Sequence, residues 1–408
     1  MSRTTKYLDD KLKNILVSLR LSSIKKHIGE EESKLTDQEN WNNALHFVCG
    51  RKNVPIKIIK YLLKVGCDLK AKTLFGETVL HKYCEYNENF EIIQLLIANG
   101  VPLNCQEGYS KENSLHFLLR NPNSTNLNTL QTLLENGVSL MTKSNNTLTP
   151  FQYYMKYSKN PTLEAVASMT KYGADWNYFC KESSALGLMS KNFSLGVEFY
   201  KLAHQTGAKF GSYINAQKET ILINICKMKT DLKVLTFALE NGGDPNLVDS
   251  NGYSPLFWLC YQTLQNVSAV NILLKFGAKV NVRLKRSCET PLHYLCKVSK
   301  PNVKIAESLF KAKAKPNLIM RKRITPIHSA LSFTKPSLDL IRCLIQNGAN
   351  INIPKRDLTT PLHTACRRNP FSGSIHLLIS NGAKVNSKDT KGRTPLLQLL
   401  LTFAIFAK

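Results

Sequence analysis

One glycine recurs at nearly constant spacing along the chain, and this periodicity limits the fold more than any other feature. Successive spacings are 34, 37, 36, 34, 35, 35, 36, 35 and 34 residues when Lys313 fills a gap in the series. A period of this length is typical of stacked repeats, in which each unit packs only on its neighbours. The glycines are Gly66, Gly100, Gly137, Gly173, Gly207, Gly242, Gly277, Gly348 and Gly382.

Two helices are predicted in each unit. Residues 92–100 and 340–348 carry apolar side chains at positions i, i+3 and i+4 and end in Asn-Gly, which favours a left-handed helix cap. About 12 residues after the glycine a Thr-Pro pair, as at Thr290 and Thr360, predicts a second helix start. The polar stretch between them, such as residues 246–254, predicts a β-turn or hairpin finger. Each unit therefore reads finger, helix, turn, helix.

These residues resemble the ankyrin repeat, whose marker is T-P-L-H-x-A. Thr290, Thr325 and Thr360 each begin a copy of the marker, and residues 382–396 match the family finger closely. The resemblance implies an all-α fold, an ankyrin-repeat α-solenoid of about ten helix-turn-helix units with short β-hairpin fingers. Residues 41–408 would form this domain, including a partial last unit.

Both ends and the middle of the chain depart from the regular pattern. Residues 1–40 are expected to form an N-terminal capping helix region, because Leu8, Leu12, Leu16 and Leu19 recur at helical spacing. Residues 151–207 have weak first helices, so we expect the least regular packing there. Extra residues and prolines are expected between the two helices of a unit. The apolar segment 396–407 predicts an unusual cap, a docking helix or a truncated unit, and it is too short to span a bilayer.

Charge is the unusual feature of the composition. Lys and Arg number 55 against 29 Asp and Glu, which gives a net charge of +26. Such a balance favours an anionic partner, although a lysine-rich solvated surface would explain it equally well. The chain has eleven cysteines and no apolar leader in its first ten residues, which indicates buried, reduced thiols. We therefore expect the cytoplasm, with the nucleus as the alternative.

The spacing His-x-x-Cys occurs four times, at His46, His81, His293 and His363, and could suggest zinc. The repeat explains it better, because each cysteine takes the place of a small buried alanine. The resemblance implies that each histidine bonds the neighbouring finger backbone. We expect no metal and no cofactor. Neither a phosphate loop, a nucleophile elbow nor paired carboxylates are visible in the sequence, so no enzyme is predicted.

The tips of four successive fingers are basic, and stacking would align them in a row. In ankyrin-like proteins the fingers and first helices line a concave binding surface, so the resemblance implies a protein-interaction scaffold. The basic tips add the expectation of an acidic protein partner at this surface, and we expect a monomer. Alternatives are a nucleic-acid-binding protein, or a ubiquitin-ligase substrate adaptor lacking its C-terminal box. The candidate partner-binding residues are Arg283, Lys285, Arg286, Arg321, Lys322, Arg323, Lys355, Arg356, Lys388, Lys391 and Arg393.

Overall fold

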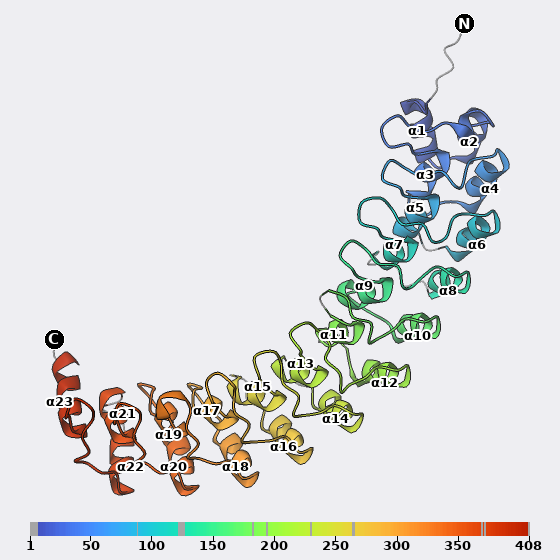
Figure 1. Ribbon diagram of the computed structural model, residues 1–408. Helices are drawn as coiled ribbons and strands as arrows, with labels where there is room; N and C mark the ends of the chain where they lie inside the picture. Colours follow the sequence, from blue (N-terminus) through green and yellow to red (C-terminus); the bar gives the residue numbers. More distant parts are fainter. Residues whose placement is uncertain are drawn as a thin grey trace. The chain divides into compact units, whose positions relative to one another are not determined.

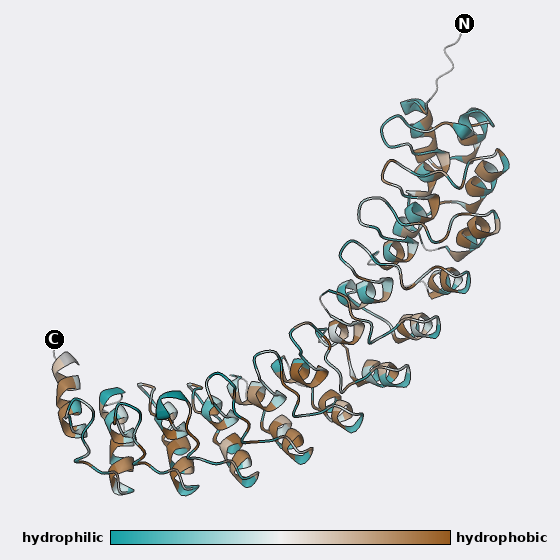
Figure 2. Ribbon diagram, viewed as in Figure 1, coloured by the Kyte–Doolittle hydropathy of each residue, from teal (hydrophilic) through white to brown (hydrophobic). Residues whose placement is uncertain are grey.

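A computed structural model of the 408-residue chain describes residues 7–87, 89–120, 127–181, 183–192, 195–228, 231–262, 266–368, 370 and 373–406. The described part is helical and contains no β-strand. It divides into two compact units, residues 1–208 and 209–408, which are described separately. Figure 1 labels the helices, and Figure 2 shows that apolar residues gather on them while the connecting loops are mainly hydrophilic.

The first unit contains two layers of helices, one of odd-numbered and one of even-numbered elements. Within each layer consecutive helices pack side by side, for example α3 on α5 and α4 on α6. Its helices are α1 (Asp10–Val17), α2 (Leu21–His27), α3 (Ala44–Cys49), α4 (Ile56–Lys64), α5 (Val79–Tyr86), α6 (Phe90–Ala98), α7 (Ser114–Arg120), α8 (Leu127–Glu135), α9 (Pro150–Tyr157), α10 (Leu163–Lys171), α11 (Ala185–Met189) and α12 (Val197–Gln205), with a 3-10 turn η1 (Glu32–Lys34).

The second unit repeats this arrangement. The odd-numbered first helices pack in one layer and the even-numbered second helices in another. Its helices are α13 (Ile221–Lys227), α14 (Leu232–Glu240), α15 (Pro255–Tyr261), α16 (Val267–Lys275), α17 (Pro291–Leu295), α18 (Val303–Lys311), α19 (Pro326–Ala330), α20 (Leu338–Gln346), α21 (Pro361–Arg368), α22 (Ser374–Ser380) and α23 (Pro395–Phe406), with a 3-10 turn η2 (Arg321–Arg323).

Helix α20 shows why these segments fold as predicted. Ser337 caps its start by accepting a hydrogen bond from the amide of Leu340. Leu340, Ile341 and Leu344 are buried, as the i, i+1, i+4 spacing requires. Burying a leucine or isoleucine contributes about 1.5–3 kcal/mol each, so this face fixes the helix against α18 and α22.

The recurring glycines end the second helices, as the spacing predicts. All nine have positive φ, between 79° at Gly137 and 97° at Gly207. Lys313, which fills the gap in the series, adopts the same left-handed conformation with φ 65°. A side chain there is strained by about 1–2 kcal/mol because its Cβ approaches the following carbonyl.

A ladder of asparagines ties several successive repeats together beside these caps. The side-chain amide of Asn281 donates to the carbonyl of Lys313 at 3.0 Å, and its oxygen accepts from the amide of Lys315 at 2.9 Å. Asn317 makes the same two bonds to Gly348 and Asn350. Each asparagine therefore pairs with one carbonyl and one amide of the turn that follows a second helix.

The fingers are turns rather than paired strands. In the finger before α15, Gly252 has φ 90°, and the amide of Asp249 donates to the carbonyl of Tyr253 at 3.1 Å. Isolated antiparallel bridges link Thr36 to Asn43, Phe179 to Ser184 and Tyr213 to Thr220. The predicted β-hairpins are thus not confirmed, because the described finger residues pair too briefly to form strands.

The ends and the middle differ in part from the expectation. Residues 10–27 form two short helices instead of one, because Leu19 adopts a left-handed φ of 51° between them. Helix α11 is short, with five residues, but so are α17 and α19, so short first helices are not confined to residues 151–207. In α23, Leu396 and Leu400 are more than half exposed. Among the described residues, no helix combines the length and apolar character needed to cross a bilayer.

Candidate functional site

Successive fingertips of the second unit are joined by main-chain hydrogen bonds. The amide of Arg321 donates to the carbonyl of Ser287 at 3.0 Å, and the amide of Arg356 donates to the carbonyl of Lys322 at 2.9 Å. The amide of Thr390 continues the series by donating to the carbonyl of Asp357 at 3.1 Å. These bonds fix the register of four neighbouring fingers, so residues at equivalent positions lie side by side.

Eight of the eleven candidate residues are exposed on these fingers and form no ion pair within the described part of the chain. We call them the basic row, and they come from the four fingers that precede α17, α19, α21 and α23. The basic row consists of Lys285, Arg286, Arg321, Lys322, Arg323, Arg356, Lys388 and Lys391.

The other three candidates are engaged within the chain. The guanidinium of Arg283 donates to the carbonyl of Ile319 in the next finger. Lys355 is half-buried and donates to the Thr364 hydroxyl at 2.9 Å, and burial lowers its pKa to about 8. These side chains hold the fingers in place, so they are less available to a partner than the sequence suggests.

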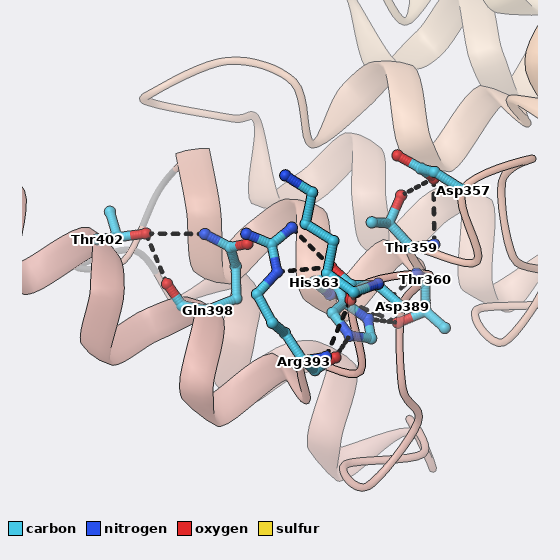
Figure 3. Close-up of polar contacts among 9 residues, drawn as sticks. Asp357, Thr359, Thr360, His363, Asp389, Arg393, Gln398 and Thr402 are labelled. Carbon is cyan, nitrogen blue, oxygen red and sulfur yellow. Dashed lines mark hydrogen bonds and ion pairs between the residues drawn. The ribbon is translucent and has the colours of Figure 1, made fainter.

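Arg393 departs furthest from the predicted role. Its guanidinium makes two hydrogen bonds to one carboxylate oxygen of Asp389, at 2.9 and 2.7 Å, as Figure 3 shows. Burial opposes ionisation of Asp389, but the bonds from Arg393 outweigh it and hold the pKa at about 2. The charge of Arg393 is therefore neutralised inside its own finger.

The finger before α19 has the most unusual backbone. Lys322 and Arg323 both have left-handed φ, 62° and 59°, and with Arg321 they form η2, in which no residue is buried. Left-handed conformations of residues other than glycine cost free energy and cluster at functional sites. This turn carries three consecutive exposed basic side chains.

The positive charge of the chain is concentrated in the second unit. Residues 209–408 contain 30 Lys and Arg residues against 10 Asp and Glu residues, a formal net charge of +20 out of the chain's +26. A field concentrated in this way attracts anionic partners and raises their association rate.

The histidines of the Thr-Pro-x-His motifs serve packing. In α17, His293 Nδ1 bonds the Thr290 hydroxyl at 2.8 Å and Nε2 bonds the carbonyl of Ile324 in the next finger at 3.2 Å. His363 repeats this with Thr360 and Arg393, at 2.9 Å in each case (Figure 3). The hydrogen bond from a histidine to the finger backbone of the next repeat, which the resemblance implies, is thus present at His293 and His363.

These contacts also argue against the zinc reading of His-x-x-Cys. Both ring nitrogens of His293 and His363 are occupied by the contacts above. Cys296 and Cys366 are buried, and burial raises the pKa of both thiols, which disfavours the thiolate that metals bind. In the part of the chain that the structure describes, no group of three His, Cys, Asp or Glu side chains could hold a metal ion.

Comparison with known families decides the classification. The family described as "Ankyrin repeats (3 copies)" matches residues 17–106, 45–144, 222–320 and 292–389, which together cover well over half of the chain. The chain belongs to the ankyrin repeat family. No curated protein sequence matches it. Ankyrin repeats are protein–protein interaction modules and in general non-catalytic scaffolds, so the surface of these repeats is where a function is to be sought.

Sequence reasoning missed one feature of the ankyrin repeats. Five aromatic side chains and Lys297 surround a cavity of about 400 Å³ on the first helices α15 and α17. Its walls come from the finger before α15, from α15 itself and from α17. The aromatic residues stand in two successive repeats, so only alignment of equivalent positions in the first helices could have grouped them. They are Tyr253, Phe257, Trp258, Tyr261 and Tyr294.

Proposed function

We propose that this ankyrin repeat protein is a scaffold that binds an acidic segment of a partner protein along the basic row. The observation that carries the proposal is the register of the fingers. Main-chain bonds such as that from Arg356 to Lys322 place exposed basic residues of four repeats next to one another. A line of cations at repeat spacing matches an extended anionic chain better than a compact ligand.

Two further observations support an acidic protein partner. The second unit carries +20 of the net charge, and the buried carboxylates Glu219 and Glu289 are already paired with Lys227 and Lys297. These two pairs compensate the charge of both buried carboxylates, although the exposed Asp357 lies beside Arg356 in the row itself. Several charge pairs would set the association rate and the orientation of the partner.

The remaining parts of the proposal concern context. All eleven cysteines are free, which is consistent with a reducing compartment such as the cytoplasm or the nucleus. Helices α1 and α2 pack on α3 and α4, and we propose that they form the N-terminal cap of the array. We also propose that the protein acts as a monomer.

Nucleic acid is the alternative that the charge allows. Binding to DNA through phosphates would give a steep dependence on salt and little preference for one sequence. An acidic peptide and a DNA strand of equal charge are therefore the two probes that separate these functions.

The decisive experiment reverses the charge of η2. The variant Arg321→Glu, Lys322→Glu, Arg323→Glu is compared with Lys275→Glu, Lys304→Glu, Lys311→Glu, which changes net charge equally on the second helices. We expect wild type and the second-helix variant to bind a labelled glutamate-rich peptide near physiological salt, and the η2 variant to lose binding with an unchanged circular dichroism spectrum. Equal loss in both variants, or tighter binding of random DNA than of the peptide, would refute the proposal.

A further inference from the structure

The aromatic cavity lies on the first-helix layer, next to the first basic finger. The finger that carries Lys285 and Arg286 leads directly into α17, whose Tyr294 forms one wall of the cavity. Tyr253 and Phe257 pack directly against Tyr294 in the same lining, with ring centroids 5.6 and 5.4 Å from that of Tyr294. A volume of about 400 Å³ is in the range of ligand pockets and is ample for one large side chain.

The walls are preorganised. The hydroxyls of Tyr253 and Tyr294 are 2.8 Å apart and hydrogen bonded, and the rings of Tyr253 and Trp258 meet edge to face with centroids 5.4 Å apart. Phe257 is buried beneath them, at 1% exposure. Tyr261, in contrast, is 54% exposed, so much of its ring is available to a ligand. Rigid aromatic walls with polar tips bind a ring at low entropic cost.

The lysines beside the aromatic rings distinguish between a cationic ligand and a neutral aromatic one. The ammonium of Lys227 lies 4.8 Å from the centroid of the Trp258 ring, and that of Lys297 lies 5.5 Å from the Tyr294 ring. The protein's own cations thus occupy the positions that a cationic ligand would need. Glu219 holds Lys227 at 2.7 Å, and Glu289 holds Lys297. A methylated or free lysine is therefore disfavoured.

One polar group of the cavity is left unsatisfied. The indole nitrogen of Trp258 is buried and has no hydrogen-bond partner among the described residues. An unpaired donor next to a pocket is a group that the acceptor of a ligand can satisfy after a small rearrangement. Together with Lys297 on the rim, it favours a ligand that brings an oxygen acceptor along with its apolar part.

We propose that this cavity is an anchor pocket for an aromatic side chain flanked by acidic residues in the partner segment. The inference rests on the proposed function, because the basic row supplies the contacts for the flanking carboxylates. The basic row then sets the association rate of the segment. The pocket sets its dissociation rate and the specificity for segments with an aromatic residue.

The test uses two labelled peptides on the full chain, one with a phenylalanine between two runs of four glutamates and one with alanine in its place. We expect the phenylalanine peptide to bind about tenfold more tightly, as a single buried anchor gives. Tyr261→Ala should remove this advantage while leaving binding of the alanine peptide unchanged. Tyr109→Ala, at a side chain that is 84% exposed in the first unit, is the matched control and should behave as wild type.

The outcomes separate the two proposals. Equal affinity for both peptides, lost on charge reversal of η2, would overturn the pocket and leave the proposed function. Binding of the phenylalanine peptide that Tyr261→Ala abolishes but charge reversal does not affect would keep the pocket and overturn the role of the basic row. A trimethyllysine peptide that binds more tightly than the phenylalanine peptide would overturn the inference, because the pocket would then be a cation cage. Failure of both peptides to bind would overturn both proposals.

Discussion

The amide of Arg356 donates a hydrogen bond to the carbonyl of Lys322, 2.9 Å away in the neighbouring finger. This bond brings two basic side chains from residues 34 positions apart into one line. Under the proposed function both charges would act on the same acidic segment, so replacing either one would change the field that both produce.

We therefore expect Lys322→Glu and Arg356→Glu each to slow association with a glutamate-rich peptide several-fold, with little effect on dissociation. Surface plasmon resonance at several salt concentrations measures both rates. The control Arg393→Ala should change association less, because Asp389 already neutralises Arg393. A faster dissociation with unchanged association would contradict the steering role of the row.

The buried histidines make stability depend on pH. Burial lowers the pKa of His46, His116 and His293 to about 4, from an ordinary value of 6.5. The unfolded chain thus binds protons that the folded chain rejects, so their contribution is complete above pH 6.5 and falls as the pH decreases toward 4. The free energy of unfolding, obtained from urea titrations at steps between pH 7 and 4, should fall by up to about 1.4 kcal/mol per histidine per pH unit.

A glutamine tests this dependence, because one repeat already uses it. Gln152 takes the histidine position in α9: its oxygen accepts from the amide of Thr149 at 3.0 Å and its nitrogen donates to the carbonyl of Tyr178 at 2.8 Å. His293→Gln should keep stability at pH 7 within about 1 kcal/mol and reduce the slope between pH 6.5 and 4. An unchanged slope would show that other groups cause the loss.

Variants at the helix cap occupied by Lys313 measure the cost of backbone strain independently of side-chain packing. Lys313→Gly should stabilise the protein by about 1 kcal/mol, because it relieves a left-handed non-glycine residue. Gly277→Ala is the reverse experiment: an added Cβ would meet no atom within 4 Å, so only the φ of 83° opposes it. It should destabilise the protein by a similar amount in urea unfolding. If Lys313→Gly destabilised the protein and Gly277→Ala stabilised it, the cap would not be under strain.

The asparagine ladder offers a matched pair of variants. Asn281→Ala removes the two bonds to Lys313 and Lys315 and should cost about 1–2 kcal/mol, because the backbone groups lose their partners. Asn386 holds the equivalent place in the last repeat and makes no such bonds in the described part of the chain. Asn386→Ala should therefore be nearly neutral. If both variants lost the same free energy of unfolding, the asparagine ladder would not contribute to stability.

Local signals in the sequence predicted the repeat well. The Thr-Pro at Thr290 marks a helix start because it caps the helix through its own side chain, and Gly348 marks a helix end because it tolerates a left-handed φ. That the described fingers form turns rather than strands was not predictable: within residues 246–254 some amides bond inside the finger, as that of Asp249 does to Tyr253, while that of Ser250 bonds Gln217 in the preceding finger. Local propensity does not distinguish a turn from a short hairpin.

The alignment of the four basic fingers could be predicted from the repeat, whereas the contacts of individual side chains could not. Arg393 looked equivalent to Lys391, yet a carboxylate four residues earlier binds it. The aromatic pocket escaped notice because Tyr253 and Tyr294 are 41 residues apart and meet only once two repeats have stacked. Pairings of this kind depend on the spacing between units, which charge and hydropathy patterns do not contain.

The bonds from the amides of Arg321, Arg356 and Thr390 to the preceding fingers use main-chain atoms alone, so they do not depend on which side chains project from those tips. Mutation can therefore exchange one set of tip residues for another while the spacing of the array is conserved. A protein with this construction can acquire new partners quickly, and an engineer could transplant a foreign four-finger sequence into it without redesigning the helices beneath.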